Sequence, residues 1–109
     1  MATLSTQQIG IGGTAPTYAA ATAGGDEFSP GGRVFFHCKN GGGSSINVTF
    51  TGIGSGPGGN PVSNRVVAVP NAGERMIGPF DPAGFAGADG LVAVAYSAVT
   101  TVTVAAFQL

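Results

Sequence analysis

Three adjoining segments set the strand pattern of this chain: Arg33-Val-Phe-Phe-His-Cys-Lys39, then Asn40-Gly-Gly-Gly-Ser-Ser45, then Ile46-Asn-Val-Thr-Phe50. In the last of them, apolar residues alternate with Asn and Thr, and a period of two is typical of a half-buried strand. The Asn40-Gly41 pair between the two apolar segments tolerates the positive φ angles that a chain reversal needs. The sequence therefore predicts a β-hairpin over residues 33–50.

The same alternation recurs towards the C-terminus. It predicts a strand over residues 65–69, a second over 74–78 that pairs back on it, and a last hairpin over 91–106. No segment shows the period of a long helix. We therefore expect an all-β fold, an antiparallel two-sheet β-sandwich of about six to eight strands. Its topology is left open between immunoglobulin-like and jelly-roll.

Turn-forming residues fill two of the remaining segments. Residues 26–32 predict a turn, and residues 79–84 predict a corner or one helical turn. Residues 18–22 are too short for a stable helix, which slightly favours a strand there. The inward positions of the predicted strands give an expected core of Val34, Phe36, Ile46, Val48, Phe50, Val67, Val69, Ile77, Val92, Val94, Tyr96, Val102 and Val104.

The chain has 109 residues, which is enough for one domain. Residues 1–17 are rich in Thr, Gln, Gly and Ala and predict an N-terminal arm or an irregular first strand. Residues 18–109 predict a single sandwich domain. Arms of this kind are often ordered only when they are docked on another surface. The loop over residues 52–61, rich in Gly and Pro, is expected to be the most flexible part of the chain.

The composition limits the classes of partner. Only 8% of the residues are charged, against roughly 25% in an average soluble domain, so we expect part of the surface to be covered by a partner or by further copies. The net charge of −1 and four scattered basic residues disfavour nucleic-acid binding. No apolar run reaches the length of a membrane helix, and the N-terminus does not resemble a secretion signal. We expect a chain that is made in the cytoplasm and has no membrane partner.

Catalytic and metal-binding patterns are missing from the sequence. His37 is the only histidine and is expected at the surface or in a subunit contact, while Cys38 is expected to be a buried, inert thiol. Asp26-Glu27 lacks the spaced oxygen ligands of a calcium loop. Residues 54–59 fit G-x-G-x-x-G, but Pro57 removes a backbone donor and no helix follows. We therefore expect no enzyme activity, no cofactor and no metal.

Glu74-Arg75 is an unusual pair of charges in such an uncharged chain. One interpretation is a solvated sheet edge, where charges discourage the addition of another strand. The other is a salt bridge between chains that sets their relative orientation. The sequence favours neither.

Three stretches resemble small virion proteins that are encoded beside the major capsid gene of tailed phages. Residues 36–44, which read Phe-His-Cys-Lys-Asn-Gly-Gly-Gly-Ser, resemble the F-x-x-V-K-N-G segment of that group, and residues 69–80 and 91–104 look like the rest of its pattern. The likeness spans most of residues 14–109. It implies a β-sandwich on the outside of a capsid, usually described as a head decoration (cement) protein or a minor structural protein.

The resemblance implies that the major capsid protein is the partner and that the chain forms a homo-oligomer, a trimer or a dimer, on the virion. It transfers no binding residue. We expect removal of residues 2–13 to weaken attachment without unfolding the sandwich. A head–tail connector or tail protein is the nearest alternative, and a carbohydrate- or host-binding module is disfavoured because the chain has no Trp and two Tyr. The candidate contact residues are Thr3, Leu4, Gln7, Gln8, Ile9, Ile11, Ile53, Glu74 and Arg75.

Overall fold

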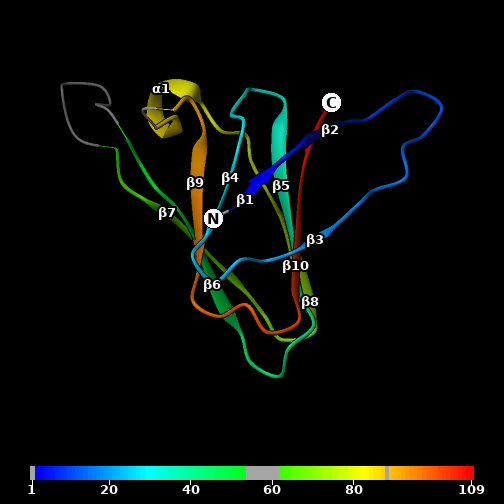
Figure 1. The fold of residues 1–109 in the computed structure, drawn as a ribbon, viewed down its shortest axis with the longest axis vertical. Helices are drawn as coiled ribbons and strands as arrows, with labels where there is room; N and C mark the ends of the chain where they lie inside the picture. The colour runs from blue at the N-terminus through cyan, green and yellow to red at the C-terminus, as the bar shows by residue number, and fades with distance from the viewer. Residues whose placement is uncertain (1, 54–61, 88) are drawn as a thin grey trace.

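A computed structural model describes residues 2–53, 62–87 and 89–109 of the chain (Figure 1). These residues form ten β-strands and one short helix, so the expected all-β class is confirmed with more strands than the predicted six to eight. The elements are β1 (Ala2–Leu4), β2 (Thr6–Gln8), β3 (Ala19–Ala20), β4 (Asp26–Phe28), β5 (Val34–Asn40), β6 (Ile46–Phe50), β7 (Arg65–Val69), β8 (Gly73–Ile77), α1 (Pro82–Phe85), β9 (Val92–Tyr96) and β10 (Val102–Gln108).

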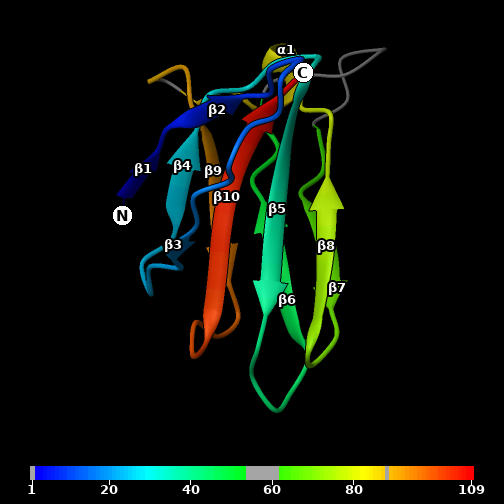
Figure 2. The same ribbon diagram turned by 90° about the vertical axis from the view of Figure 1, so that its right-hand side faces the viewer.

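The strands form two sheets that pack face to face, as the predicted β-sandwich requires (Figure 2). One sheet has the order β1-β4-β9-β6-β7, and the other has the order β2-β10-β5-β8, with β3 also paired to β10. The sheets are mixed, because the N-terminal strands β1 and β2 run parallel to β4 and β10.

Four nested antiparallel pairings relate the other strands: β6 with β7, β5 with β8, β4 with β9, and β3 with β10. They describe one long hairpin of four strands against four, rolled up so that successive strands alternate between the two sheets. This is the jelly-roll topology. The sequence left the topology open between immunoglobulin-like and jelly-roll. The strand pairings show that it is a jelly roll.

The three predicted hairpins are wrong, although their strands lie where they were expected. β5 and β6 belong to different sheets, and so do β7 and β8, and β9 and β10. Among the described strands, the only consecutive pair that is hydrogen-bonded is β6 with β7, across residues 51–64. Alternation shows which side of a strand is buried, but not which strand lies beside it. A turn within one sheet and a crossing between two sheets therefore look alike in the sequence.

Asn40 shows how one such crossing is held. It continues β5 instead of opening a tight turn, and it is buried. Its side-chain nitrogen donates to the carbonyls of Ser44 at 2.8 Å and Val69 at 3.2 Å, and its oxygen accepts from the Gly42 amide at 3.0 Å. The side chain thus joins the end of β5 to the end of β7 in the opposite sheet.

The core lies between the sheets and is largely the predicted one. Val67 and Tyr96 are only half-buried and pack against its rim. The sequence did not predict Phe28, which is fully buried and 5.1–5.3 Å, ring centre to ring centre, from Phe36 and Phe80. Phe80 also lies 4.7 Å from Phe50, so the centre of the sandwich is an aromatic cluster.

The turn predicted over residues 26–32 is also wrong at its start, where Asp26–Phe28 forms β4 between β1 and β9. Gly25 makes this possible: its φ is +94°, and a Cβ there would lie 2.6 Å from the Val94 carbonyl oxygen. The chain can turn sharply there and still enter the sheet. Of the corner or helical turn expected over 79–84, the structure has the helical turn, which begins at Pro82 and ends at Phe85 as α1. The Asp81 side chain accepts from the Ala83 amide at its start.

Cys38 lies in the core without exposed surface, as expected for a buried thiol. Burial raises the pKa of this thiol to about 11. In the unfolded chain the thiol is in water, where its pKa is about 8.5. The unfolded state therefore loses this proton at lower pH than the folded state, and stability falls as the pH rises through that window.

We expect the free energy of unfolding, measured by urea titration, to decline between about pH 9 and pH 11. The variant Cys38→Ala should show a flatter decline because it lacks the group. Tyr96 acts in the same direction at higher pH, since burial and its bond to Asp26 raise the pKa of its hydroxyl. Identical slopes for the variant and the natural chain would contradict this account.

Candidate functional site

The two sheets differ on the sides that face away from the core. On the β1-β4-β9-β6-β7 sheet, the outward residues are mostly small or polar, as at Asn47, Thr49, Ala93 and Ala95. On the β2-β10-β5-β8 sheet they include three large apolar side chains, Phe35, Met76 and Phe107, next to the polar His37, Lys39 and Glu74. We call this second surface, together with the N-terminal residues that cover its edge, the apolar face; it consists of Ile9, Pro16, Tyr18, Phe35, Met76 and Phe107.

These side chains line an open groove of about 210 Å³. Phe35 from β5 stacks on Phe107 from β10 with ring centres 5.5 Å apart, and the ring of Tyr18 meets the edge of Phe107 at 5.9 Å. Met76 on β8 is 67% exposed. The two stacked rings and the exposed Met76 side chain thus all belong to the lining of the groove.

Beside the groove, three polar side chains form a chain of hydrogen bonds. The Tyr18 hydroxyl lies 2.6 Å from His37 Nδ1, and His37 Nε2 lies 3.0 Å from Glu74 Oε1. A carboxylate can only accept, so Nε2 carries the proton in this bond and Nδ1 accepts from the Tyr18 hydroxyl when the ring is neutral. His37 is buried, which corrects the first of the two expectations, a surface histidine, whereas a subunit contact stays a prediction. The reason for its burial is that Tyr18 covers it.

The order of tyrosine, histidine and glutamate resembles a nucleophile, a base and an orienting acid. Burial and the nearby Glu74 carboxylate raise the pKa of Tyr18, so the hydroxyl keeps its proton and donates to His37. Lys39 Nζ lies 4.0 Å from the centre of the Tyr18 ring. Together these contacts hold residue 18 against the sheet.

Residues 9–17 form a loop that projects from the body of the protein (Figure 1). At its tip the Gly13 amide donates to the Gly10 carbonyl at 3.0 Å, and the Thr14 hydroxyl donates to the Gln8 carbonyl while it accepts from the Gly10 amide. Ile11 lies in this turn and is fully exposed. We call residues 10–13 the projecting turn.

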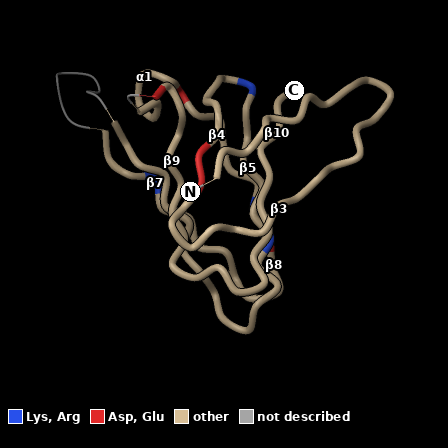
Figure 3. Tube along the Cα trace, in the orientation of Figure 1, with Lys and Arg blue, Asp and Glu red and all other residues tan. Residues whose placement is uncertain are grey.

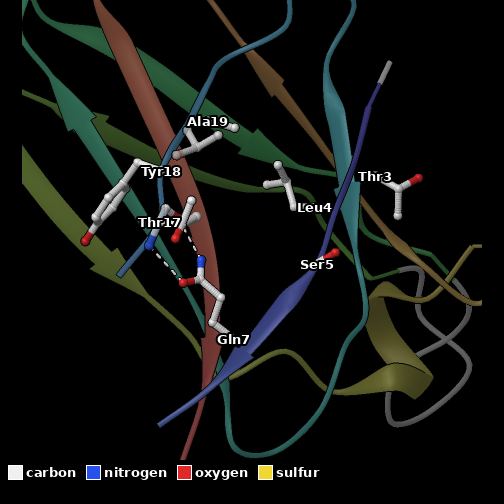
Figure 4. Close-up of a pocket in the computed structure, with 9 residues that line it drawn as sticks. Thr3, Leu4, Ser5, Gln7, Thr17, Tyr18 and Ala19 are labelled. Atoms are coloured by element: carbon white, nitrogen blue, oxygen red, sulfur yellow. Dashed lines mark hydrogen bonds between the residues drawn. The ribbon is translucent and has the colours of Figure 1, made fainter. Parts of the chain in front are cut away.

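The base of the loop is also braced. The Gln7 side-chain nitrogen donates to the Thr17 carbonyl at 2.7 Å, and its oxygen accepts from the Thr17 amide at 2.9 Å (Figure 4). A hollow of about 280 Å³ lies beside this contact, between β1 and β3, and Leu4 and Tyr18 take part in its wall. The N-terminal arm is therefore ordered on its own body, and the projecting turn stands on a fixed base.

The predicted contact residues are only partly brought together. Ile9 lines the apolar face, and Ile11 lies at the tip of the loop. Gln7 and Gln8 are in β2, where Gln7 braces the base of the loop and Gln8 accepts a hydrogen bond from Gln108. Glu74 is at the other side of this face. Thr3 and Leu4 are in β1 on the opposite sheet, and Ile53 lies beside α1, where its amide donates to the Gly84 carbonyl at 2.7 Å. Most of the predicted loop contact over 52–61 lies outside the described residues.

Glu74 and Arg75 are consecutive in β8, so their side chains point to opposite sides of the sheet. Glu74 bonds to His37, and Arg75 donates to the backbone carbonyl of residue 74 at 2.8 Å. β8 is an edge strand, as the solvated-edge interpretation requires. The interchain salt bridge stays a prediction.

The sequence missed Tyr18, Phe35, Met76 and Phe107 as functional candidates. Phe35 and Met76 carried a signal, because each is a large apolar residue at an outward position of a predicted strand. Tyr18 carried no such signal, since its place over the sheet depends on β5 and β10, which follow later in the chain.

Charged residues are few and scattered along the chain (Figure 3). The carboxyls of Glu27 and Asp89 are neighbours, and the hydrogen bond that protonated Glu27 donates to Asp89 raises the pKa of Glu27. Within residues 2–53, 62–87 and 89–109, no three His, Cys, Asp or Glu side chains gather as metal ligands would. No helix in these ranges has the length and apolar character to cross a membrane.

Comparison of the chain with protein-family models, curated proteins and solved structures finds no match.

Proposed function

We propose that this chain is a structural protein of a tailed-phage particle, a decoration protein that binds the outside of the head and bridges neighbouring major capsid subunits. The resemblance of residues 36–44, 69–80 and 91–104 to such virion proteins supports the phage assignment. The jelly roll is compatible with it, since that fold occurs in viral capsid proteins, but it also occurs in lectins and enzymes.

The projecting turn is the observation that carries a binding role. Ile11 is fully exposed, yet the turn that presents it is held by hydrogen bonds from Thr14 and stands on the Gln7–Thr17 contact. A rigid loop loses little conformational entropy when it binds. An apolar side chain presented in this way is suited to fill a pocket on a partner, as binding hot spots do.

The mechanism of the proposed function is mechanical. Each copy contributes a small apolar contact through the projecting turn, and many copies on one shell act together. Low charge keeps the contact insensitive to salt. Bridging of this kind stabilises the shell because two capsid subunits cannot separate without breaking the contacts of the protein that joins them.

The variant Ile11→Asp should bind capsids about 30-fold more weakly, because a charge would have to be buried in an apolar contact. Co-sedimentation with capsids that lack this protein measures the change. The matched control is Val66→Asp, an exposed apolar residue on β7 in the other sheet, which should bind normally. Equal binding by both variants would remove the projecting turn from the proposal. Deletion of residues 2–13 is a weaker test, because it also removes the paired strands β1 and β2.

A reconstruction of virions that contain this chain tests the function itself. Density repeated over the capsid lattice supports the decoration role. Density confined to the portal vertex or the tail would replace it with the connector or tail alternative. Absence of the chain from virions would overturn the assignment to a phage particle.

A further inference from the structure

We infer that the apolar face binds a second copy of this chain, so that two protomers pack through their β2-β10-β5-β8 sheets about a two-fold axis. The inference does not depend on the virion role, because it concerns the purified chain alone.

The asymmetry between the two sheets is the first step. A sheet that faces water normally has polar outward residues. The outward residues of the β1-β4-β9-β6-β7 sheet are mostly small or polar, with Val66 as an exposed larger apolar residue on its edge strand. The other sheet instead presents the stacked rings of Phe35 and Phe107, with Met76 and Ile9 exposed beside them. Aromatic residues and Met are enriched at protein interfaces and are unusual together on a free surface.

The charges on the same side identify the partner. Lys39 on β5 and Glu74 on β8 are register partners next to the apolar face, and they carry opposite charges. Among the described residues, no carboxylate lies within ion-pair distance of Lys39. A surface with one cation and one anion beside an apolar patch is complementary to itself, because a two-fold axis brings residue i of one copy to residue j of the other and j to i. A strongly acidic or strongly basic partner would not be electrostatically complementary to this surface.

The edge of β8 is less suited to self-association than its outward side. If two β8 strands paired about a two-fold axis centred on Arg75 or on Glu74, that residue would face its own copy, and like charges opposite each other are destabilising. Packing of two copies through the apolar face does not require either charge to lie opposite its own copy.

Sedimentation equilibrium of the purified full chain tests the inference. The natural chain should dimerise, and Met76→Glu should weaken the dimer at least about 30-fold, because it places a charge in the apolar contact. The matched control is Val66→Glu, an exposed apolar residue on the edge strand of the other sheet, which should dimerise normally. Far-UV circular dichroism confirms that both variants fold.

A charge-reversal experiment tests the two-fold geometry. Lys39→Glu alone and Glu74→Lys alone should each dimerise poorly, because each homodimer contains two like-charge pairs. An equimolar mixture of the two variants should form a heterodimer, since both pairs then have opposite charges. Changes within a single chain, such as loss of the Glu74–His37 bond, are not repaired by mixing.

Three results would overturn the inference. The first is a natural chain that stays monomeric up to about millimolar concentration, which would leave the apolar face to another protein. The second is a dimer that Met76→Glu does not weaken or that Val66→Glu weakens equally. The third is a mixture of the charge-reversal variants that stays monomeric.

Discussion

Replacing Phe28 with alanine should lower the free energy of unfolding by about 4 kcal/mol and the midpoint of thermal unfolding by roughly 15–25 °C. Phe28 has no exposed surface and lies 5.1–6.2 Å, ring centre to ring centre, from Phe36, Phe50 and Phe80. Its removal takes away the apolar transfer energy of the ring and leaves a cavity among rings that cannot all move inward. Urea titration and calorimetry measure the loss.

The control is Phe35→Ala, the same substitution at a half-buried position on the outward side of β5. We expect it to cost less than half as much, since water can occupy the vacated space. If Phe35→Ala were as damaging as Phe28→Ala, the aromatic cluster would not be the centre of stability. A folded but weakly cooperative Phe28→Ala protein would still meet the expectation, because loss of the sharp transition is itself the effect.

Replacing Asp26 with alanine should cost about 3 kcal/mol of the free energy of unfolding. The carboxyl group is fully buried and accepts hydrogen bonds from the Tyr96 hydroxyl at 2.7 Å, the Thr22 amide at 3.2 Å and the Ala2 amide at 3.3 Å. Alanine would leave these three donors without their acceptor. Unpaired buried donors cost more than the bond itself contributes when both partners are present.

A double-mutant cycle makes this prediction specific. Tyr96→Phe removes the hydroxyl donor, so Asp26→Ala combined with Tyr96→Phe should cost less than the sum of the two single changes. Glu27→Ala, on the outward side of the same strand, should leave stability nearly unchanged. Additive losses in the double variant would show that the Tyr96–Asp26 bond is not the source of the effect. Faster hydrogen exchange at Thr22 in Asp26→Ala would show that the carboxyl also holds the segment before β4.

Both predictions concern β4, which the sequence had assigned to a turn. Asp, Ser, Pro and Gly surround Phe28 in residues 26–32, and such residues are typical of turns. β4 has three residues, too few for alternation to be recognised. Its burial follows from its place between β1 and β9. No residue near it in the sequence indicates that β4 will lie there.

The candidate site was predictable to a similar extent. Ile9 and Ile11 were expected contacts because they lie in the predicted N-terminal arm, and Glu74 because its charge is unusual in so uncharged a chain. Phe35 and Met76 were visible as outward residues, but their proximity depends on β5 pairing with β8, which was not predicted. His37 was expected at the surface or in a subunit contact, because nothing in its own strand indicates that Tyr18 will cover it.

An all-β chain, the positions of its longer strands and most of its core follow from the residues alone, since each depends on the direction of side chains within a few positions. The pairing order, the jelly roll, the buried Asp26 and the apolar face do not. The Tyr18–His37 bond joins residues 19 apart, and the Tyr96–Asp26 bond joins residues 70 apart. Such groups meet only when the rolled sheets bring them together, because local alternation is equally compatible with several strand neighbours.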